Sequence, residues 1–269
     1  MHVKPNKDVH LCSRKSIPLD NLNNATPEGI FNSSTMNSVR TKMLNGECVA
    51  GCEKCYHEEK VNKGQSLRTF MNNWFDQLLN HNNVLPWKEG FLDRAINLDT
   101  NWEDVFAHTT PSIKWVALHA SNVCNLACRG CYSLLSTKWR KDEEQLGINP
   151  YPLQNAKLHE FGFNFDDIDF VTMYGGKPFY MKQNNELTNT IESDPNIKNK
   201  ILQYFTNGMI LPSAQTFAIW RRIRQLQLII SIDSYDTEND YFRHGSKWSV
   251  LEKNLQLYIK ESLNYNYEL

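Results

Sequence analysis

Seven cysteines divide into sets of three and four, and each set has the composition of a metal site. The first set lies in the segment CNLACRGC, where Cys124, Cys128 and Cys131 follow a C-x3-C-x2-C pattern. Three thiolates can hold an iron–sulfur cluster and leave one iron open, which is the arrangement that chemistry at a metal requires. The alternatives are reduced spectator thiols or a zinc site, for which His119 is the nearest fourth ligand. The spacing favours the open cluster.

The second set repeats this spacing in the segment CVAGCEKC, with Cys48, Cys52 and Cys55, and Cys12 stands alone upstream. Together these four thiols could form a closed site that relays electrons or stabilises the fold. The spacing does not distinguish an iron–sulfur cluster from zinc, and His57 is an alternative ligand. We expect a second 4Fe-4S cluster, with zinc as the alternative.

The overall composition narrows the class of protein. A length of 269 residues allows two folding units, and the formal net charge of -1 makes nucleic acid an unlikely partner. No apolar run approaches the roughly 20 residues of a membrane helix, so no membrane partner is expected. The first residues, MHVKPNKDVHLC, lack the apolar region of a secretory signal. We therefore expect a cytoplasmic protein whose cysteines are thiols available to metals.

Two regions with different patterns follow one another along the chain. Residues 1 to about 60 are poor in periodicity and rich in Asn, Pro and Gly, as in segments that a metal orders. Ser66 is a candidate N-cap for a helix with one apolar face through Leu79, and 82–112 reads as a connection. We predict a Cys-rich region with a helix over 1–112.

Four apolar runs predict the strands of the second region, 113–269. They cover 114–121, 169–176, 200–208 and 226–234, and helical patterns cover 212–226 and 246–262. Alternation of strand and helix predicts an α/β fold with parallel strands. In such folds the chemistry lies beyond the carboxyl ends of the strands, and polar or cysteine residues follow each predicted strand here.

Five segments in order resemble the motifs of the radical S-adenosylmethionine (SAM) enzymes. SNVCNLACRGCYS (121–133) resembles the cluster loop, and MYGGKP (173–178) resembles the GGE motif that holds the SAM amino group. TNG (206–208) and SID (231–233) correspond to the motifs after the third and fourth strands, and YFRHGSKW (241–248) to the following arginine-and-glycine segment. The resemblance covers about 114–262.

This resemblance implies a partial (β/α) barrel that binds a 4Fe-4S cluster and SAM. Cys124, Cys128 and Cys131 would ligate three irons and SAM the fourth. One electron, from a donor such as a flavodoxin or ferredoxin, would cleave SAM to a 5′-deoxyadenosyl radical that abstracts hydrogen from a substrate. The residues expected to bind the cofactor are Gly175, Gly176, Lys177, Pro178, Thr206, Asn207, Ser231, Asp233 and Arg243.

The chemistry of several of these residues suits contact with a cofactor. Gly175 and Gly176 would let the backbone approach a ligand, and Arg243 could pair with the SAM carboxylate. Ser231 and Asp233, two positions apart on a predicted strand, would share one face. One position departs from the family pattern, because Lys177 stands where the family has a glutamate.

The first region also carries a resemblance. The segment 52–68 resembles the N-terminal half-motif of the twitch subgroup, in which an abbreviated auxiliary-cluster region is joined to the core. Auxiliary regions of this kind accompany the modification of peptides or proteins, so a peptide is the favoured substrate class. The alternative function is a metal-binding interaction module, with zinc or iron–sulfur sites, that performs no catalysis.

The last residues, NYNYEL (264–269), read as the beginning of a fifth strand. Family cores have six strand–helix units, and only four are counted up to residue 262. We therefore expect a chain truncated at its C-terminal end, without the last two strands.

Overall fold

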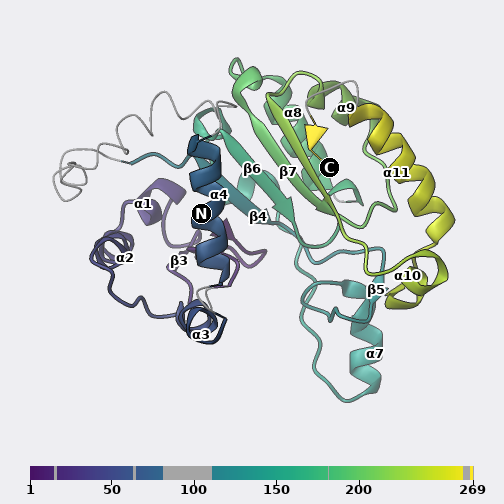
Figure 1. The fold of residues 1–269 in the computed structure, drawn as a ribbon, viewed down its shortest axis with the longest axis horizontal. Coiled ribbons are helices and arrows are strands. Elements are labelled where there is room, and N and C mark those ends of the chain that lie inside the picture. The colour runs from purple at the N-terminus through teal and green to yellow at the C-terminus, as the bar shows by residue number, and fades with distance from the viewer. Residues whose placement is uncertain (15–16, 63–64, 81–110, 181, 263–266, 269) are drawn as a thin grey trace. The chain divides into compact units, whose positions relative to one another are not determined.

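The computed structural model describes residues 1–14, 17–62, 65–80, 111–180, 182–262 and 267–268 (Figure 1). Two compact units make up the chain, of which one combines Met1–Val9 with Lys114–Leu269 and the other spans His10–Ile113. The predicted boundary between residues 112 and 113 lies one residue before the point, between Ile113 and Lys114, where the chain returns to the first unit. Residues 1–9, which were predicted to belong to the Cys-rich region, instead form part of the unit that contains the sheet.

The first unit is built on a mostly parallel sheet. Its strands are β1 (His2–Val3), β2 (Asp8–His10), β4 (Trp115–His119), β6 (Phe170–Tyr174), β7 (Ile201–Thr206), β8 (Gln225–Ile230) and β10 (Tyr267–Glu268). They lie in the order β10-β8-β7-β6-β4-β1-β2, and each pair from β10 to β1 is parallel. Strands that follow one another in this list along the chain, from β4 to β10, are therefore also neighbours in the sheet, as in a sheet wound in a single direction.

The four predicted strands correspond to β4, β6, β7 and β8. Most of their apolar residues are buried, although Phe205 on β7 and Ile229 on β8 are 37% and 38% exposed. Leu118, Met173, Ile201, Leu226 and Val116 are each at most 2% exposed. The predicted fifth strand over 264–269 corresponds to β10, which pairs with β8, although residues 263–266 and 269 lie outside the described residues.

Helices follow the strands and lie along one side of β6 and β7 in Figure 1. They are α8 (Lys182–Glu192), α9 (Ala214–Trp220) and α11 (Trp248–Ser262), and α10 (Asp236–Phe242) precedes α11. Shorter pieces are η2 (Thr137–Trp139), α7 (Arg140–Gln145), η3 (Leu158–Phe161), η4 (Phe165–Asp167), η5 (Pro178–Tyr180) and η6 (Ile197–Asn199). The helix predicted over 212–226 is shorter, because Ser213 caps its start and the chain already enters β8 at Gln225.

The sheet is open in the part of the chain that the structure describes. Its strand order contains no pairing that would join β10 to the opposite edge, so these residues form no closed barrel. The fold class is thus α/β with a mostly parallel sheet. In addition, no helix among the described residues is long and apolar enough to cross a membrane.

A ladder of polar side chains crosses the middle of the sheet. The Trp115 indole N–H donates to Thr172 Oγ1 at 3.0 Å, and the Thr172 hydroxyl donates to Gln203 Oε1 at 3.0 Å. Gln203 Nε2 in turn donates to Gln227 Oε1 at 2.8 Å. Register explains the contacts, because Thr172, Gln203 and Gln227 lie directly opposite one another on β6, β7 and β8. The ladder fixes how four strands align.

The second unit is mainly helical. Its elements are β3 (Asp20–Asn21), α1 (Pro27–Phe31), α2 (Ser34–Leu44), α3 (Glu53–Val61) and α4 (Leu67–Asn80). Ser66 caps α4 as predicted, since its Oγ accepts from the Thr69 N–H at 3.1 Å. The prediction that Phe70 lies on a buried apolar face of this helix is wrong, because 63% of the residue is exposed.

Candidate metal centre

The three thiols of the CNLACRGC segment gather in a loop that follows β4. Cys124 and Cys128 are buried, and Cys131 packs against them together with Met209 and Leu126. The Leu126 N–H donates to Cys124 Sγ at 3.5 Å. Such N–H···S contacts are among the features that set the properties of a thiolate-bound cluster.

Electrostatics favour an ionised thiol in this group. Cys128 donates a hydrogen bond to Cys131, which lowers the pKa of Cys131 to about 7 and raises the pKa of Cys128. Burial and the neighbouring Cys124 oppose the shift of Cys131. Because a metal ligand must be a thiolate, an ionised Cys131 suits metal binding near neutral pH.

Two kinds of metal site, a cluster and a single ion, are candidates for these donors. Zinc would require its sulfur ligands at about 2.3 Å from one point. The described residues contain no group of three or more His, Cys, Asp or Glu side chains that could hold one metal ion. A cluster instead binds each thiolate on a separate iron, so the thiols need only face a shared space. The thiols of Cys124, Cys128 and Cys131 therefore have the donor chemistry of an iron–sulfur cluster, and zinc stays the alternative.

The ends of two strands are tied to the cysteine loop. Beyond β6, the Lys177 N–H donates to the Val123 carbonyl at 3.1 Å. Beyond β7, Asn207 Nδ2 donates to Asn125 Oδ1 at 2.9 Å. Because β4, β6 and β7 are parallel, their carboxyl ends meet at one edge of the sheet, and the thiols lie at that edge.

The segment after α10 holds the loop from another direction. Strand β5 (Ala127–Cys128) pairs antiparallel with β9 (Arg243–His244). The Arg129 N–H donates to the Phe242 carbonyl at 2.8 Å, and Arg129 Nε donates to the Tyr241 carbonyl at 3.1 Å. The Arg129 guanidinium also lies 3.8 Å from the Tyr241 ring centroid. The segment that resembles the family's arginine-and-glycine motif is thus fixed against the cysteines.

Two consecutive glycines form the turn after β6. Gly175 and Gly176 have φ values of +74° and +53°, a left-handed conformation that side chains disfavour. A Cβ on Gly175 would lie 1.8 Å from Cδ2 of His119, at the end of β4. The glycine therefore allows the backbone to pass beside a buried imidazole, and the turn directs the next residue toward the cysteines.

Lys177 follows this turn and lies within electrostatic range of all three cysteines. Burial lowers the pKa of the Lys177 ammonium, Cys124, Cys128 and Cys131 oppose this shift, and Arg243 adds to it. The lysine side chain is partly buried. A cation thus lies within electrostatic range of the thiols at the position where the resembling family has a glutamate.

Arg243 and Asp233, both predicted cofactor contacts, pair with each other. Arg243 Nε lies 3.0 Å from Asp233 Oδ2, and its Nη2 donates to Oδ1 at 3.2 Å. Arg243 Nη1 also lies 3.9 Å from Cys128 Sγ. The guanidinium therefore links the predicted ribose-binding segment to the cysteine loop.

Ser231 and Asp233 do not alternate along a strand, because β8 ends at Ile230. The Ser231 N–H still donates to the Thr206 carbonyl at 2.8 Å. The chain then turns toward α10, where the Asp233 N–H donates to Asn239 Oδ1 at 3.1 Å. Beyond the end of β8, the Asn239 side-chain amide therefore accepts the backbone hydrogen bond that a neighbouring strand would otherwise accept.

The remaining predicted residues lie at the same edge of the sheet. Pro178 is buried and begins η5 directly after Lys177. Thr206 is the last residue of β7, and its Oγ1 accepts from the Gly208 N–H at 3.2 Å. Asn207 is also buried, with 1% exposed. The structure therefore brings the predicted residues of the second region to one edge.

The second cysteine set is arranged differently. Cys52 occupies the N-cap of α3, Cys55 is buried in the first turn, Cys48 is exposed and Cys12 is half-buried. All seven cysteines are free thiols, and His57 lies farther along α3. Among the described residues, these thiols belong to no group of three or more His, Cys, Asp or Glu side chains placed to hold one metal ion, and zinc stays an alternative for them. A second cluster stays a prediction.

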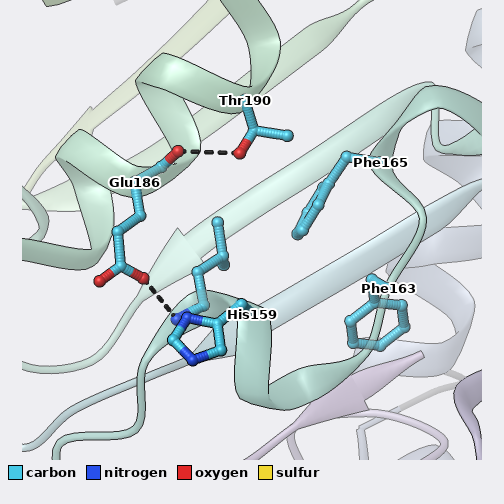
Figure 2. A pocket seen from close by; sticks show the side chains of 6 residues that line it. His159, Phe163, Phe165, Glu186 and Thr190 are labelled. Atoms are coloured by element: carbon cyan, nitrogen blue, oxygen red, sulfur yellow. Dashed lines mark hydrogen bonds between the residues drawn. The ribbon is translucent and has the colours of Figure 1, made fainter.

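A pocket of about 350 Å³ lies on another part of the first unit (Figure 2). It is lined by Leu158, His159, Phe163, Phe165, Glu186 and Thr190. Glu186 Oε2 accepts from the Leu158 N–H at 2.7 Å, so this carboxylate already holds the start of η3. The lining includes none of the residues predicted to bind a metal or cofactor.

Comparisons with family models, curated proteins and solved structures find no match for this chain. The fold and site define an α/β protein with three thiols at the carboxyl edge of its sheet. What these thiols do is inferred from the residues themselves.

Proposed function

We propose that this chain is a radical SAM enzyme that uses a 4Fe-4S cluster and acts on an unidentified substrate. One observation carries the proposal. The three-thiol loop is hydrogen-bonded to the ends of β6 and β7 through Lys177 and Asn207, and it pairs with the segment that contains Arg243. The motifs that resemble this family are thus neighbours in space as well as ordered in sequence.

The chain's own residues would divide the work in a defined way. Cys124, Cys128 and Cys131 would ligate three irons of the cluster, leaving one iron for SAM. A reduced cluster held there would supply one electron to cleave bound SAM into methionine and a 5′-deoxyadenosyl radical able to abstract hydrogen from a substrate. The turn at Gly175 and Gly176 would let backbone groups approach SAM without a side chain in the way.

Other residues would position the ligand. Thr206, Asn207, Pro178, Ser231 and Asp233 lie at the strand ends that would surround SAM. Arg243 would hold the loop after β8 against Cys128, since its guanidinium already contacts both Asp233 and that sulfur. The open, singly wound sheet is compatible with the partial barrel that the proposal implies.

The second unit would supply an auxiliary site. Cys12, Cys48, Cys52 and Cys55 would hold a second 4Fe-4S cluster that relays electrons from a flavodoxin- or ferredoxin-like donor. A peptide or protein is the substrate class that we propose, because auxiliary regions of this type accompany peptide modification in the resembling subgroup.

The test is anaerobic reconstitution of the full chain with iron and sulfide, followed by dithionite and SAM. We expect about eight irons per chain, by the count of two cubane clusters, and formation of 5′-deoxyadenosine. Alanine replacement of Cys124, Cys128 and Cys131 should remove about four irons and all SAM cleavage. Replacement of Cys48, Cys52 and Cys55 is the matched control, which should remove as much iron but leave some SAM cleavage.

The outcomes separate the two candidate functions. Zinc in place of iron, without SAM cleavage, would contradict the enzyme proposal and leave a metal-binding interaction module. Iron with 5′-deoxyadenosine would support the enzyme and direct the search to peptide substrates.

A further inference from the structure

Lys177 is fixed against the cysteine loop by its own backbone. Its N–H donates to the Val123 carbonyl at 3.1 Å, one residue before Cys124. The left-handed turn at Gly175 and Gly176 precedes it and leaves little freedom, because the imidazole of His119 occupies the space beside Gly175. The position of the lysine relative to the thiols is therefore built into the fold at the end of β6.

The charges of Lys177 and Arg243 both act on the thiols, but only the Arg243 charge is shared with a carboxylate. The Arg243 guanidinium is paired with Asp233, with Nε 3.0 Å from Oδ2. Among the described residues, no carboxylate forms an ion pair with Lys177, and the opposite charges that it meets are those of the three cysteines. The lysine is also partly buried, so solvent and salt screen this interaction less than they would at the surface.

A cation in this place acts on the oxidised and reduced forms of a cluster to different extents. Reduction adds one negative charge to the cluster, and a nearby ammonium stabilises the more negative form. Net charge and hydrogen bonds around the sulfurs are among the factors that set cluster potentials. A lysine within electrostatic range of all three thiols therefore favours the reduced cluster, whereas a carboxylate there would disfavour it.

We propose that Lys177 raises the reduction potential of the cluster held by Cys124, Cys128 and Cys131. This inference rests on the proposed function, because it requires the cluster. In this role Lys177 does not react itself but changes how readily the cluster accepts an electron. It also implies that the electron donor can be weaker than one able to reduce the same cluster beside a carboxylate.

The test is a redox titration of the reconstituted full chain, followed by electron paramagnetic resonance. The resonance that belongs to this cluster is identified by its loss in Cys124→Ala. In Lys177→Met we expect the ratio of reduced to oxidised cluster at the wild-type midpoint to fall about tenfold, equivalent to about 59 mV for one electron. Lys177→Arg keeps the charge and should keep the potential. Lys182→Met, an exposed lysine at the start of α8, is the matched control and should change nothing.

Each outcome bears on a separate claim. An unchanged potential in Lys177→Met, with normal iron content, would overturn the inference and leave the proposed function intact. Absence of iron in the wild-type chain would overturn the proposed function and the inference together, and iron analysis reveals this before any titration. If Lys177→Met loses its cluster, Lys177→Gln provides a second neutral variant. Loss of the cluster from both, but not from Lys177→Arg, would mean that the charge is needed for assembly and would overturn a role confined to potential.

Discussion

A side-chain carbon on Gly175 would lie 1.8 Å from Cδ2 of His119, closer than any non-bonded contact allows. Gly175→Ala should therefore lower the free energy of unfolding through two effects. The left-handed φ of +74° costs an alanine about 1–2 kcal/mol, and the clash adds about 1–3 kcal/mol of overpacking. Urea unfolding followed by circular dichroism measures the sum.

Gly147 offers a control for this substitution. Its φ is +72°, but a Cβ there would meet nothing within 4 Å, so Gly147→Ala should show the backbone cost alone. Equal losses of stability in the two variants would contradict the clash. Adding His119→Ala to Gly175→Ala should restore part of the difference, because it removes the opposing imidazole.

Lys200 and Asp194 form a buried ion pair, 2.8 Å from Nζ to Oδ2, at the opposite end of the sheet. The ammonium also donates to the carbonyls of Phe165, Asp166 and Ile168. Lys200→Met would leave a buried carboxylate and three carbonyls without this partner. We expect a loss of about 3–5 kcal/mol in the free energy of unfolding.

Lys198 is exposed two residues earlier, and Lys198→Met should change stability by no more than about 0.5 kcal/mol. Thermal and urea unfolding of both variants provide the comparison. A Lys200→Met protein as stable as Lys198→Met would show that the buried pair contributes nothing. The further change Asp194→Leu should recover stability only partly, because the three carbonyls still lack the ammonium donor and, among the described residues, only that of Phe165 keeps a backbone partner, the Ile168 N–H.

Stability should depend on pH through His119. Burial lowers the pKa of this imidazole to about 4, from a usual value of 6.5. Between these values the unfolded chain binds a proton that the folded chain does not, so stability is full above pH 6.5 and falls as the pH is lowered toward 4. The loss approaches about 3 kcal/mol.

Urea unfolding of the iron-free protein at several pH values between 4.5 and 7 measures this dependence. His119→Gln is the comparison, because its side chain has no charge in this range. Its stability should fall less steeply with decreasing pH than that of the wild type. Parallel curves would mean that His119 titrates alike in both states.

The sequence predicted the strands well because parallel strands read as nearly continuous apolar runs. Their ends were overestimated, since 226–234 ran past Ile230 into residues whose hydrogen bonds belong to α10. Strand β1 was missed because His2 and Val3 are too few to show any periodicity.

The candidate site was predicted in part. Spacing located Cys124, Cys128 and Cys131, because three thiols in one short loop must lie near one another. The pairing of Asp233 with Arg243 could not be read from the chain, since it depends on how β9 returns to β5. For Cys52 and Cys55 the spacing was the same as in the first loop, but here it falls at the start of a helix. Identical spacing therefore does not fix identical geometry.

The hydrogen bond from Asn207 to Asn125 leads to a last prediction, on how the cysteine loop is held. Asn207 is buried, its Nδ2 donates to Asn125 Oδ1 at 2.9 Å, and its own Oδ1 accepts from the Met209 N–H at 3.1 Å. Asn207→Asp keeps the shape and the acceptor but places an oxygen opposite the Asn125 oxygen. A buried polar group left unpaired costs about 1–3 kcal/mol, and more when it is charged.

We expect the loop to loosen and the reconstituted chain to lose iron faster to a chelator. Asn185→Asp, on an exposed position of α8, should release iron at the wild-type rate. Similar rates in all three proteins would mean that the other contacts of the loop, at Lys177 and β9, suffice to hold the thiols in place.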